Sequence, residues 1–475
     1  MVLLLLKARR LLLILIVIQY CFFSAGAQGS DSFQTQSPPI TLKNTIIGHD
    51  IKIKKRFWRA AGEWTLVQLL PWANNYYIAK GDFAKINFKS IWQNLNPAHL
   101  EWDDNQFVIN QFSHPYHGNL YFNSFRSNGY NFWESSIATF AGSLTWETMG
   151  ETFSPSSNDL INTTFGGIAI GEATNRLSKI ILRKKAVKPK TYINESLAFM
   201  INPMQGLNRV IDGDFGKPYK STDPDNTRVG LLADAGQRFI TQRGKFAGNK
   251  PVTEFFGRVR LQYGDPFTDL KEPFSNFFMA GEIGNSDTAI VNTIKIEGFI
   301  FGKKIKKNKA AEHVVDITLN YDFYQNSAFI YSTQHLLTNL HSRFNFSKIF
   351  QLTTTAGAGI MLLAAVPNTQ KVSGVRRNYD YCSGVAFKAN AGINLANKLF
   401  YTFNCDVGIG KTISGNNLSH LFYNLESEFR LILYKGIAIS ASRSDFIFDG
   451  YYEHSPKVSN RYMFNHFGLG YKLIL

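Results

Sequence analysis

The sequence contains few cysteines and, after its first residues, no long apolar segment. Cys21, Cys382 and Cys405 are the only cysteines among 475 residues, which excludes a small secreted domain held together by disulfides. After residue 27, no stretch approaches the roughly 20 consecutive apolar residues that a membrane-spanning helix needs. If the chain crosses a membrane, we therefore expect it to do so as a closed β-barrel, in which every backbone polar group is paired.

Proline is rare in the C-terminal half of the chain. Between Phe274 and Leu475 it occurs only at Pro367 and Pro456. Since proline cannot donate a ladder hydrogen bond, its absence from long segments is typical of continuous sheet. Apolar and polar residues alternate there with a period of two: from Val315 to Phe323, every odd position is apolar and every even position is polar.

This alternation predicts an outer-membrane β-barrel of about twelve antiparallel strands over residues 228–475. The last segment, Arg461–Leu475, is a strand with one apolar face, and we expect the barrel-assembly machinery to recognise it. We place short periplasmic turns at Asn397-Lys398 and Lys435-Gly436, and long extracellular loops at residues 366–380 and 449–460. Cys382 and Cys405 fall on opposite faces of their strands, so we expect no disulfide between them.

The inward face of the predicted barrel carries charges of both signs. These charges could line a water-filled lumen or surround a polar plug, and a barrel of about twelve strands allows either arrangement. The residues that we expect to face the lumen are Asp234, Arg258, Arg260, Asp316, Glu426, Glu428 and Arg430.

The N-terminus has the three parts of a secretory signal. Lys7, Arg9 and Arg10 precede an apolar run over residues 11–23, and Ala25-Gly26-Ala27 forms a small-residue cleavage site. We predict a signal peptide over residues 1–27, a flexible lead over residues 28–57 and location in the cell outer membrane. The net charge of +16 falls to +13 once Lys7, Arg9 and Arg10 are removed with the signal peptide. This basic surplus suits contact with outer-membrane lipids and lipopolysaccharide, and we expect no nucleic-acid partner.

Residues 58–227 lack the period of two and are predicted to be a helical domain. We expect one helix over Trp58–Ala79, kinked at Pro71. A second begins at Ser113-His114-Pro115, because proline suits the first helical turn, and runs towards Phe132 with a break expected at Gly129. We expect a third over Trp133–Met149 and a fourth from Ser154 to Arg183.

The helical domain resembles a known family, domain of unknown function 3943, over about residues 90–220. That family belongs to Gram-negative envelope proteins, and the resemblance implies no established activity. It is carried by these residues: Trp102-Asp103-Asp104-Asn105, Asn110, His114-Pro115, Gly118, Arg126, Gly142–Glu147 with Trp146, Glu151, Asn158-Asp159-Leu160, Gly166-Gly167 and Gly171-Glu172.

The strongest candidate for chemistry is a set of two histidines and two glutamates: His114, His117, Glu147 and Glu151. Two glutamates four residues apart share a helix face, so the set could bind a divalent metal, or His114, Glu147 and Glu151 could perform acid–base catalysis. Alternatively, the glutamates pair with Arg126 or Arg176 in a polar helix interface, which we expect more often for such a pattern.

Two other polar motifs have ordinary structural interpretations. Asn158-Asp159 is a good helix N-cap. Asp103-Asp104-Asn105 lacks the full twelve-residue calcium loop, so we predict a turn. We expect no cofactor, since the chain has no glycine-rich phosphate loop and no CxxC pair.

Three functions remain open on the sequence alone. The first is an envelope component or channel whose lumen is partly occupied by the N-terminal helices. The second is an envelope lipid-acting enzyme that uses the Glu/His set. The third is a binding or assembly module on the periplasmic side, anchored by the barrel. We favour the first, which is not an enzyme.

Overall fold

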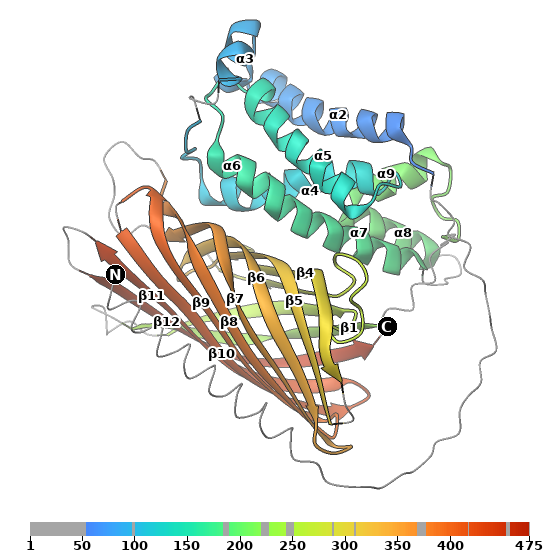
Figure 1. Cartoon of the computed structure of the whole chain (residues 1–475), viewed down its shortest axis with the longest axis vertical. Helices are drawn as coiled ribbons and strands as arrows, with labels where there is room; N and C mark the ends of the chain where they lie inside the picture. Colours follow the sequence, from blue (N-terminus) through green and yellow to red (C-terminus); the bar gives the residue numbers. More distant parts are fainter. Residues whose placement is uncertain are drawn as a thin grey trace.

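The computed structural model describes residues 54–96, 100–183, 190–219, 228–243, 251–286, 289–307, 310–367, 377–416, 418–452 and 457–474. A helical domain is followed by a β-barrel (Figure 1). The predicted signal peptide, and the predicted lead as far as residue 53, lie outside the described residues.

The barrel is closed and consists of twelve antiparallel strands, as the alternation predicted. Each strand pairs with its neighbours in sequence, and the first strand pairs with the last, so that Gly230 lies opposite Ile474. The strands are β1 (Val229–Arg243), β2 (Val252–Tyr263), β3 (Phe277–Gly284), β4 (Val291–Lys307), β5 (Ala311–Gln325), β6 (Ile330–Asn345), β7 (Phe350–Pro367), β8 (Tyr379–Leu395), β9 (Leu399–Ser414), β10 (Leu418–Tyr434), β11 (Ile437–Tyr452) and β12 (Val458–Ile474).

We name the two ends of the barrel after the course of the chain. The terminal end is the one where β1 begins, β12 ends and the β2–β3 connection lies. The far end is the opposite one, which carries the β5–β6 and β7–β8 connections. Along β12, Phe467, Leu469 and Tyr471 are exposed on the outer wall, whereas His466 lines the interior. The period of two in the sequence thus separates an apolar outer wall from a polar lumen.

The helical domain consists of short and medium helices, several of which contain π-helical turns. None of the described helices is both long enough and apolar enough to cross a membrane. The elements are α2 (Phe57–Ala73), η1 (Asn74–Ile78), η2 (Asp82–Ala84), α3 (Phe88–Asn94), η4 (Ile109–Ser113), α4 (His114–Arg126), α5 (Phe132–Thr145), η5 (Trp146–Gly150), α6 (Ser157–Ile161), η6 (Asn162–Gly166), α7 (Gly167–Arg183), α8 (Lys190–Ile201) and α9 (Pro203–Ile211).

Local sequence explains where several helices begin. Asn131 and Glu134 form a reciprocal capping box at the start of α5. Asn202 caps α9, and Pro203 occupies its first turn. Helix α4 ends near Gly129, which has a positive φ of 91°. The predicted break at Gly129, between the helix that begins at Ser113-His114-Pro115 and the next helix, is therefore confirmed.

The helical domain packs against the outer wall of the barrel over β4 to β8 (Figure 1). Phe107 stacks on Phe323, with ring centroids 5.5 Å apart, and the Tyr321 hydroxyl donates to the Gln111 carbonyl at 2.6 Å. Tyr321 and Phe323 alternate along β5 with residues of the lumen face. The expectation that the helices partly occupy the lumen is therefore wrong, since aromatic residues on the outer wall hold the helices outside.

Candidate functional site

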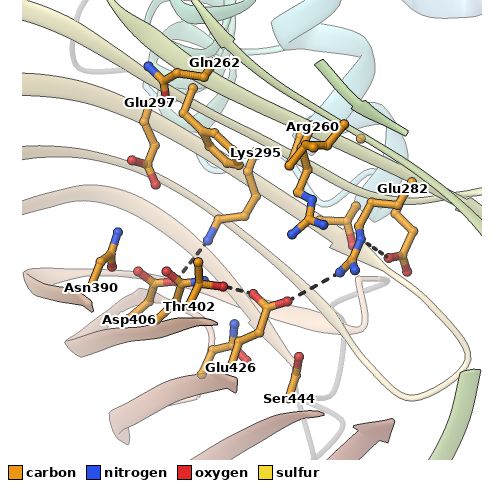
Figure 2. Close-up of a pocket in the computed structure, with 18 of the residues that line it drawn as sticks. Arg260, Gln262, Glu282, Lys295, Glu297, Asn390, Thr402, Asp406, Glu426 and Ser444 are labelled. Carbon is orange, nitrogen blue, oxygen red and sulfur yellow. Dashed lines mark hydrogen bonds and ion pairs between the residues drawn. The ribbon is translucent and has the colours of Figure 1, made fainter. Parts of the chain in front are cut away.

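The lumen is crossed by ion pairs that join opposite sides of the barrel. Lys295 on β4 donates to Asp406 on β9 at 2.9 Å, and Figure 2 shows its side chain extended across the lumen. Lys388 on β8 pairs with Glu297 on β4. Strands β4 and β9 lie on nearly opposite sides of the ring of strands, so these pairs narrow the lumen rather than merely line it.

A second group of ion pairs lies nearer the terminal end and centres on Glu428 of β10. Its carboxylate accepts from Arg258 at 2.9 Å, from Arg260 at 2.8 Å and from Arg430 at 2.9 Å. Arg260 and Arg430 also bind Asp234 on β1. Charge-assisted bonds of this kind are about twice as strong as neutral ones, so the group forms a rigid bridge between β2 and β10.

Aromatic side chains narrow the lumen towards the far end. The β5–β6 connection folds inward, so that Phe329 stacks on Phe446 of β11 with ring centroids 3.6 Å apart. Tyr331 stacks on Phe422 of β10 at 4.2 Å. In the same connection, Ser327 donates to Glu254, which also pairs with Arg238. The far end is thus covered by side chains of the barrel itself.

The terminal end is narrowed by the β2–β3 connection. Phe267 is buried beneath the Arg343 guanidinium, which lies 4.0 Å from the centre of its ring. Arg343 also donates to Asp265 at 2.5 Å, and Pro266 lines the lumen. Both ends therefore have a connection folded over the opening.

Between these layers lies a cavity of about 560 Å³. All its described lining residues belong to the barrel, and none belongs to the helical domain. Charges of both signs face it, including Lys295, Arg258, Asp406 and Glu426. Apolar side chains also line the cavity, among them Leu231, Phe278 and Phe464. The combination of charges and apolar surface suits a small charged solute.

The structure places the residues that we expected to face the lumen as follows. Arg258, Arg260 and Glu426 line the cavity. Asp234, Glu428 and Arg430 are buried in the ion pairs beside it. Asp316 accepts from Asn339 at 2.9 Å and contacts His341. The aromatic layer was missed, since no pattern in the sequence shows that the β5–β6 connection turns inward.

A second candidate site lies in the helical domain, where His114, Glu147 and Asp159 converge. One ligand atom from each of these residues lies within 4.8 Å of the others, and His114 Nε2 is 3.7 Å from Asp159 Oδ1. We call these three residues the acid–histidine cluster. Glu147 accepts from the Ser156 amide at 2.8 Å, and Glu151 accepts from the Trp146 indole at 2.7 Å.

The carboxyl groups of this cluster are buried close to one another. Burial, together with neighbouring Asp159 and Glu151, raises the pKa of Glu147 well above its usual range. Burial and the nearby Asp103 likewise raise the pKa of Asp159. Among the described residues, no lysine or arginine forms an ion pair with Glu147, Glu151 or Asp159. The cluster therefore combines three possible ligands, and burial favours the neutral, protonated form of its carboxyl groups while no lysine or arginine is paired with them.

The structure corrects three predictions for this region. His117 is not part of the cluster, because its Nε2 lies 3.0 Å from the Val67 carbonyl. Arg126 and Arg176 do not pair with Glu147 or Glu151: both bind the buried Glu172. Asn158 is not an N-cap. Its side chain accepts instead from the Asp103 amide at 2.8 Å, which ties an irregular segment to α6.

Other residues of the family resemblance attach the helical domain to the barrel. Asn110 donates to the hydroxyls of Tyr379 and Tyr381, at 3.0 Å in both cases. Trp102 packs on Tyr381, and the Asn105 carbonyl accepts from Tyr379 at 2.9 Å. Pro115 lies against Gly166 between α4 and η6. These residues thus have a structural role that their sequence pattern did not reveal.

Comparisons with solved structures find outer-membrane barrels. The NanC porin is 9% identical with a TM-score of 0.29, covering 51% of this chain and 100% of the porin. The outer membrane channel DcaP of Acinetobacter baumannii is 10% identical with a TM-score of 0.25, covering 52% and 96%. The KdgM porin is 11% identical with a TM-score of 0.22, covering 50% and 98%. Likeness of this degree carries no argument about the function of this chain.

No curated protein matches the sequence significantly. A family model matches part of the helical domain, with the acid–histidine cluster inside the matched range. The resemblance noted in the sequence is thereby confirmed: residues 99–204 of this chain match the model of the Domain of unknown function (DUF3943).

Proposed function

We propose that this chain is an outer-membrane channel whose resting state is closed by its own lumen side chains. The observation that carries the proposal is the set of ion pairs that join β4 to β9 and β2 to β10 across a charged cavity. Exposed aliphatic and aromatic residues on the outer wall, such as Leu469 and Phe467, support a bilayer as the surroundings of the barrel.

A buried ion pair is weak evidence for stability, because desolvation offsets much of the attraction between its charges. A barrel selected only for stability could be filled by apolar side chains instead. Paired charges around a cavity are more useful in a conduit. There, a charged solute or water can replace one partner of an ion pair and so open the pair. The solute that fits this lumen is small and ionic or zwitterionic.

The test is uptake of small charged solutes into liposomes that contain the full chain. In Glu428→Gln, three arginines lose a shared carboxylate and repel one another, so we expect uptake to rise severalfold over the unaltered chain. Asp82→Asn is the matched control, since it also removes one carboxylate but at an exposed position of the helical domain. Equal uptake by Glu428→Gln and Asp82→Asn, with both barrels folded, would contradict the proposal.

A second candidate function is divalent-metal binding at the acid–histidine cluster. It is favoured by the position of His114, Glu147 and Asp159, whose ligand atoms already lie close together without a cationic partner. One imidazole and two carboxylates suit a transition metal, and three protein ligands leave a position open for chemistry.

This second candidate is tested by calorimetric titration of the chelator-treated chain with Zn²⁺ and with Mn²⁺. We expect one ion to bind per chain. Replacing a residue that only supports a metal ligand already lowers metal affinity by about tenfold or more. Asp159→Asn, which alters a proposed ligand itself, should therefore weaken binding by more than about tenfold. Asp82→Asn should bind as the unaltered chain does. If neither ion binds, or if Asp159→Asn binds equally well, the cluster is not a metal site.

A further inference from the structure

The helical domain has a polar interior. Asn119, Asn123, Glu172 and Asn175 are all buried between its helices. The Asn123 amide donates to Asn119 at 2.8 Å and in turn accepts from Asn202 at 2.9 Å. Interiors of water-soluble helical domains are mainly aliphatic and aromatic, so this network of amides is unusual for a domain surrounded by water.

The exterior of the same domain is apolar. In α5, Ser135, Thr139 and Ser143 face inward, whereas Ile137 is 69% exposed. A helix on the surface of a soluble protein has the opposite arrangement. Helices α2 and α8 repeat the pattern, and the exposed large apolar residues of the three helices include Trp58, Leu66, Leu69, Leu70, Ile137, Phe140, Leu144, Ile193, Leu197 and Met200.

The helix packing also has the form expected in lipid. Gly118 on α4 and Gly167 on α7 bring the two backbones together: a Cβ at Gly167 would lie 2.6 Å from the Gly118 Cα. Thr174 on α7 donates to Asn119 on α4 at 2.9 Å. Small residues at the contact and hydrogen bonds between polar side chains are what hold helices together where the hydrophobic effect is absent.

The helical domain covers the barrel wall from one end to the other. At the far end, Asn110 binds Tyr379 and Tyr381 beside the β7–β8 connection. At the terminal end, Arg176 donates to the Pro273 carbonyl of the β2–β3 connection at 2.8 Å. The helical domain therefore lies at the same level along the barrel axis as the outer wall that it covers. A bilayer that surrounds the barrel would surround the helical domain as well.

Two ion pairs of the helical domain lie at the terminal end. Lys55 pairs with Glu134 at the start of α5, and Arg56 pairs with Asp212 at the end of α9. The first residue of α5, Phe132, packs on Phe274 of the β2–β3 connection, which places this charged rim at the terminal end. Charges at that level, with apolar faces between the two ends, match the head-group and acyl-chain layers of a membrane.

We propose that the helical domain lies inside the bilayer beside the barrel and that acyl chains cover the apolar faces of α2, α5 and α8. This inference rests on the proposed outer-membrane location of the barrel. It places the acid–histidine cluster in the lipid-surrounded part of the protein, next to the far end. Lipid is favoured over a second copy of the chain, because the apolar residues lie on three helices and continue the lipid-facing wall.

The test is spin-label accessibility in full-length protein reconstituted into vesicles. Cys21, Cys382 and Cys405 are replaced by alanine, and single labels are introduced as Ile137→Cys and Leu197→Cys. Leu469→Cys, at 67% exposure on the outer wall of β12, reports whether the barrel itself is in lipid, and Lys398→Cys reports water at a turn. We expect the labels at 137, 197 and 469 to collide with oxygen and to be shielded from a water-soluble nickel chelate.

The outcomes separate the two proposals. If 469 is in lipid but 137 and 197 meet the nickel chelate, the helical domain is in water and the inference fails while the barrel proposal stands. If 137 and 197 are shielded from both reagents, protein covers them, and a second copy replaces lipid as the occupant. If 469 itself meets the chelate, the membrane location of the barrel fails.

Discussion

Single glycines decide how closely the helices of the helical domain approach. Gly118 lies where α4 crosses η6 and α7, and a Cβ placed there would lie 1.8 Å from the Thr163 carbonyl oxygen. Gly62 on α2 is the opposite case, since a Cβ there meets no atom within 4 Å. The same change of residue should therefore have opposite effects at the two positions.

Gly118→Ala should lower the free energy of unfolding by about 2–3 kcal/mol, because the added methyl group forces two backbones apart. Gly62→Ala should raise it by up to about 1 kcal/mol, because alanine favours the helix. Denaturant unfolding in detergent, followed by circular dichroism, measures both changes. A Gly118→Ala chain as stable as Gly62→Ala would show that α4 and α7 are not packed as described.

At the level of residues, the sequence did not show how the polar groups of the helical domain come together. His114 and Glu147 lie together as expected, but the third residue beside them is Asp159, for which the sequence suggests a helix cap. The spacing of four residues relates side chains within one helix only. His114, Glu147 and Asp159 come from α4, η5 and α6, and packing between separate elements cannot be read from spacing.

Among the structural elements, the β5–β6 connection has the clearest functional consequence. Asn326 to Phe329 turn into the lumen, where Phe329 stacks on Phe446 and Ser327 binds Glu254. A connection that served only to link two strands would not need a phenylalanine buried in the lumen. We infer that this connection covers the far end of the conduit.

Phe329→Ala should increase solute uptake into liposomes, because it removes a ring from the aromatic layer while leaving the charge of the lumen unchanged. The matched control is Phe346→Ala, which removes the same group from an exposed turn at the terminal end. We expect uptake with Phe346→Ala to equal that of the unaltered chain. A Phe329→Ala chain that also behaves like the unaltered one would mean that the far end is closed by other groups.

The strands and the positions of several turns, such as Asn397-Lys398 and Lys435-Gly436, were predictable, but the direction in which a connection folds was not. The period of two is imposed by the backbone of a strand, so β5, β9, β10 and β12 could be located from sequence alone. The helices α3, α8 and α9 were not predicted individually; they have 7, 12 and 9 residues, and helices this short give only a brief apolar period. The direction in which a connection folds depends on side chains that are distant in the sequence. The β5–β6 connection, for example, turns inward where Phe329 stacks on Phe446 of β11.

For the whole molecule, the relation between helices and barrel was the main error of the sequence interpretation. A helical region without an evident partner suggested a plug for a wide lumen. The barrel instead fills its own lumen with paired charges and aromatic rings, and it offers the helices a strip of outer wall over β4 to β8. Alternation shows that a strand has two faces, but it does not show which apolar face is covered by protein.

The central claim is that the barrel is a conduit closed by its own side chains, and single-channel recording in planar bilayers tests it most directly. The full chain should stay closed most of the time. The same chain with Glu428→Gln and Phe329→Ala together should show long-lived open states, because one change loosens the ion pairs and the other opens the far end. If the doubly altered protein is folded and inserted but passes no more current than the unaltered protein, the barrel is not a channel.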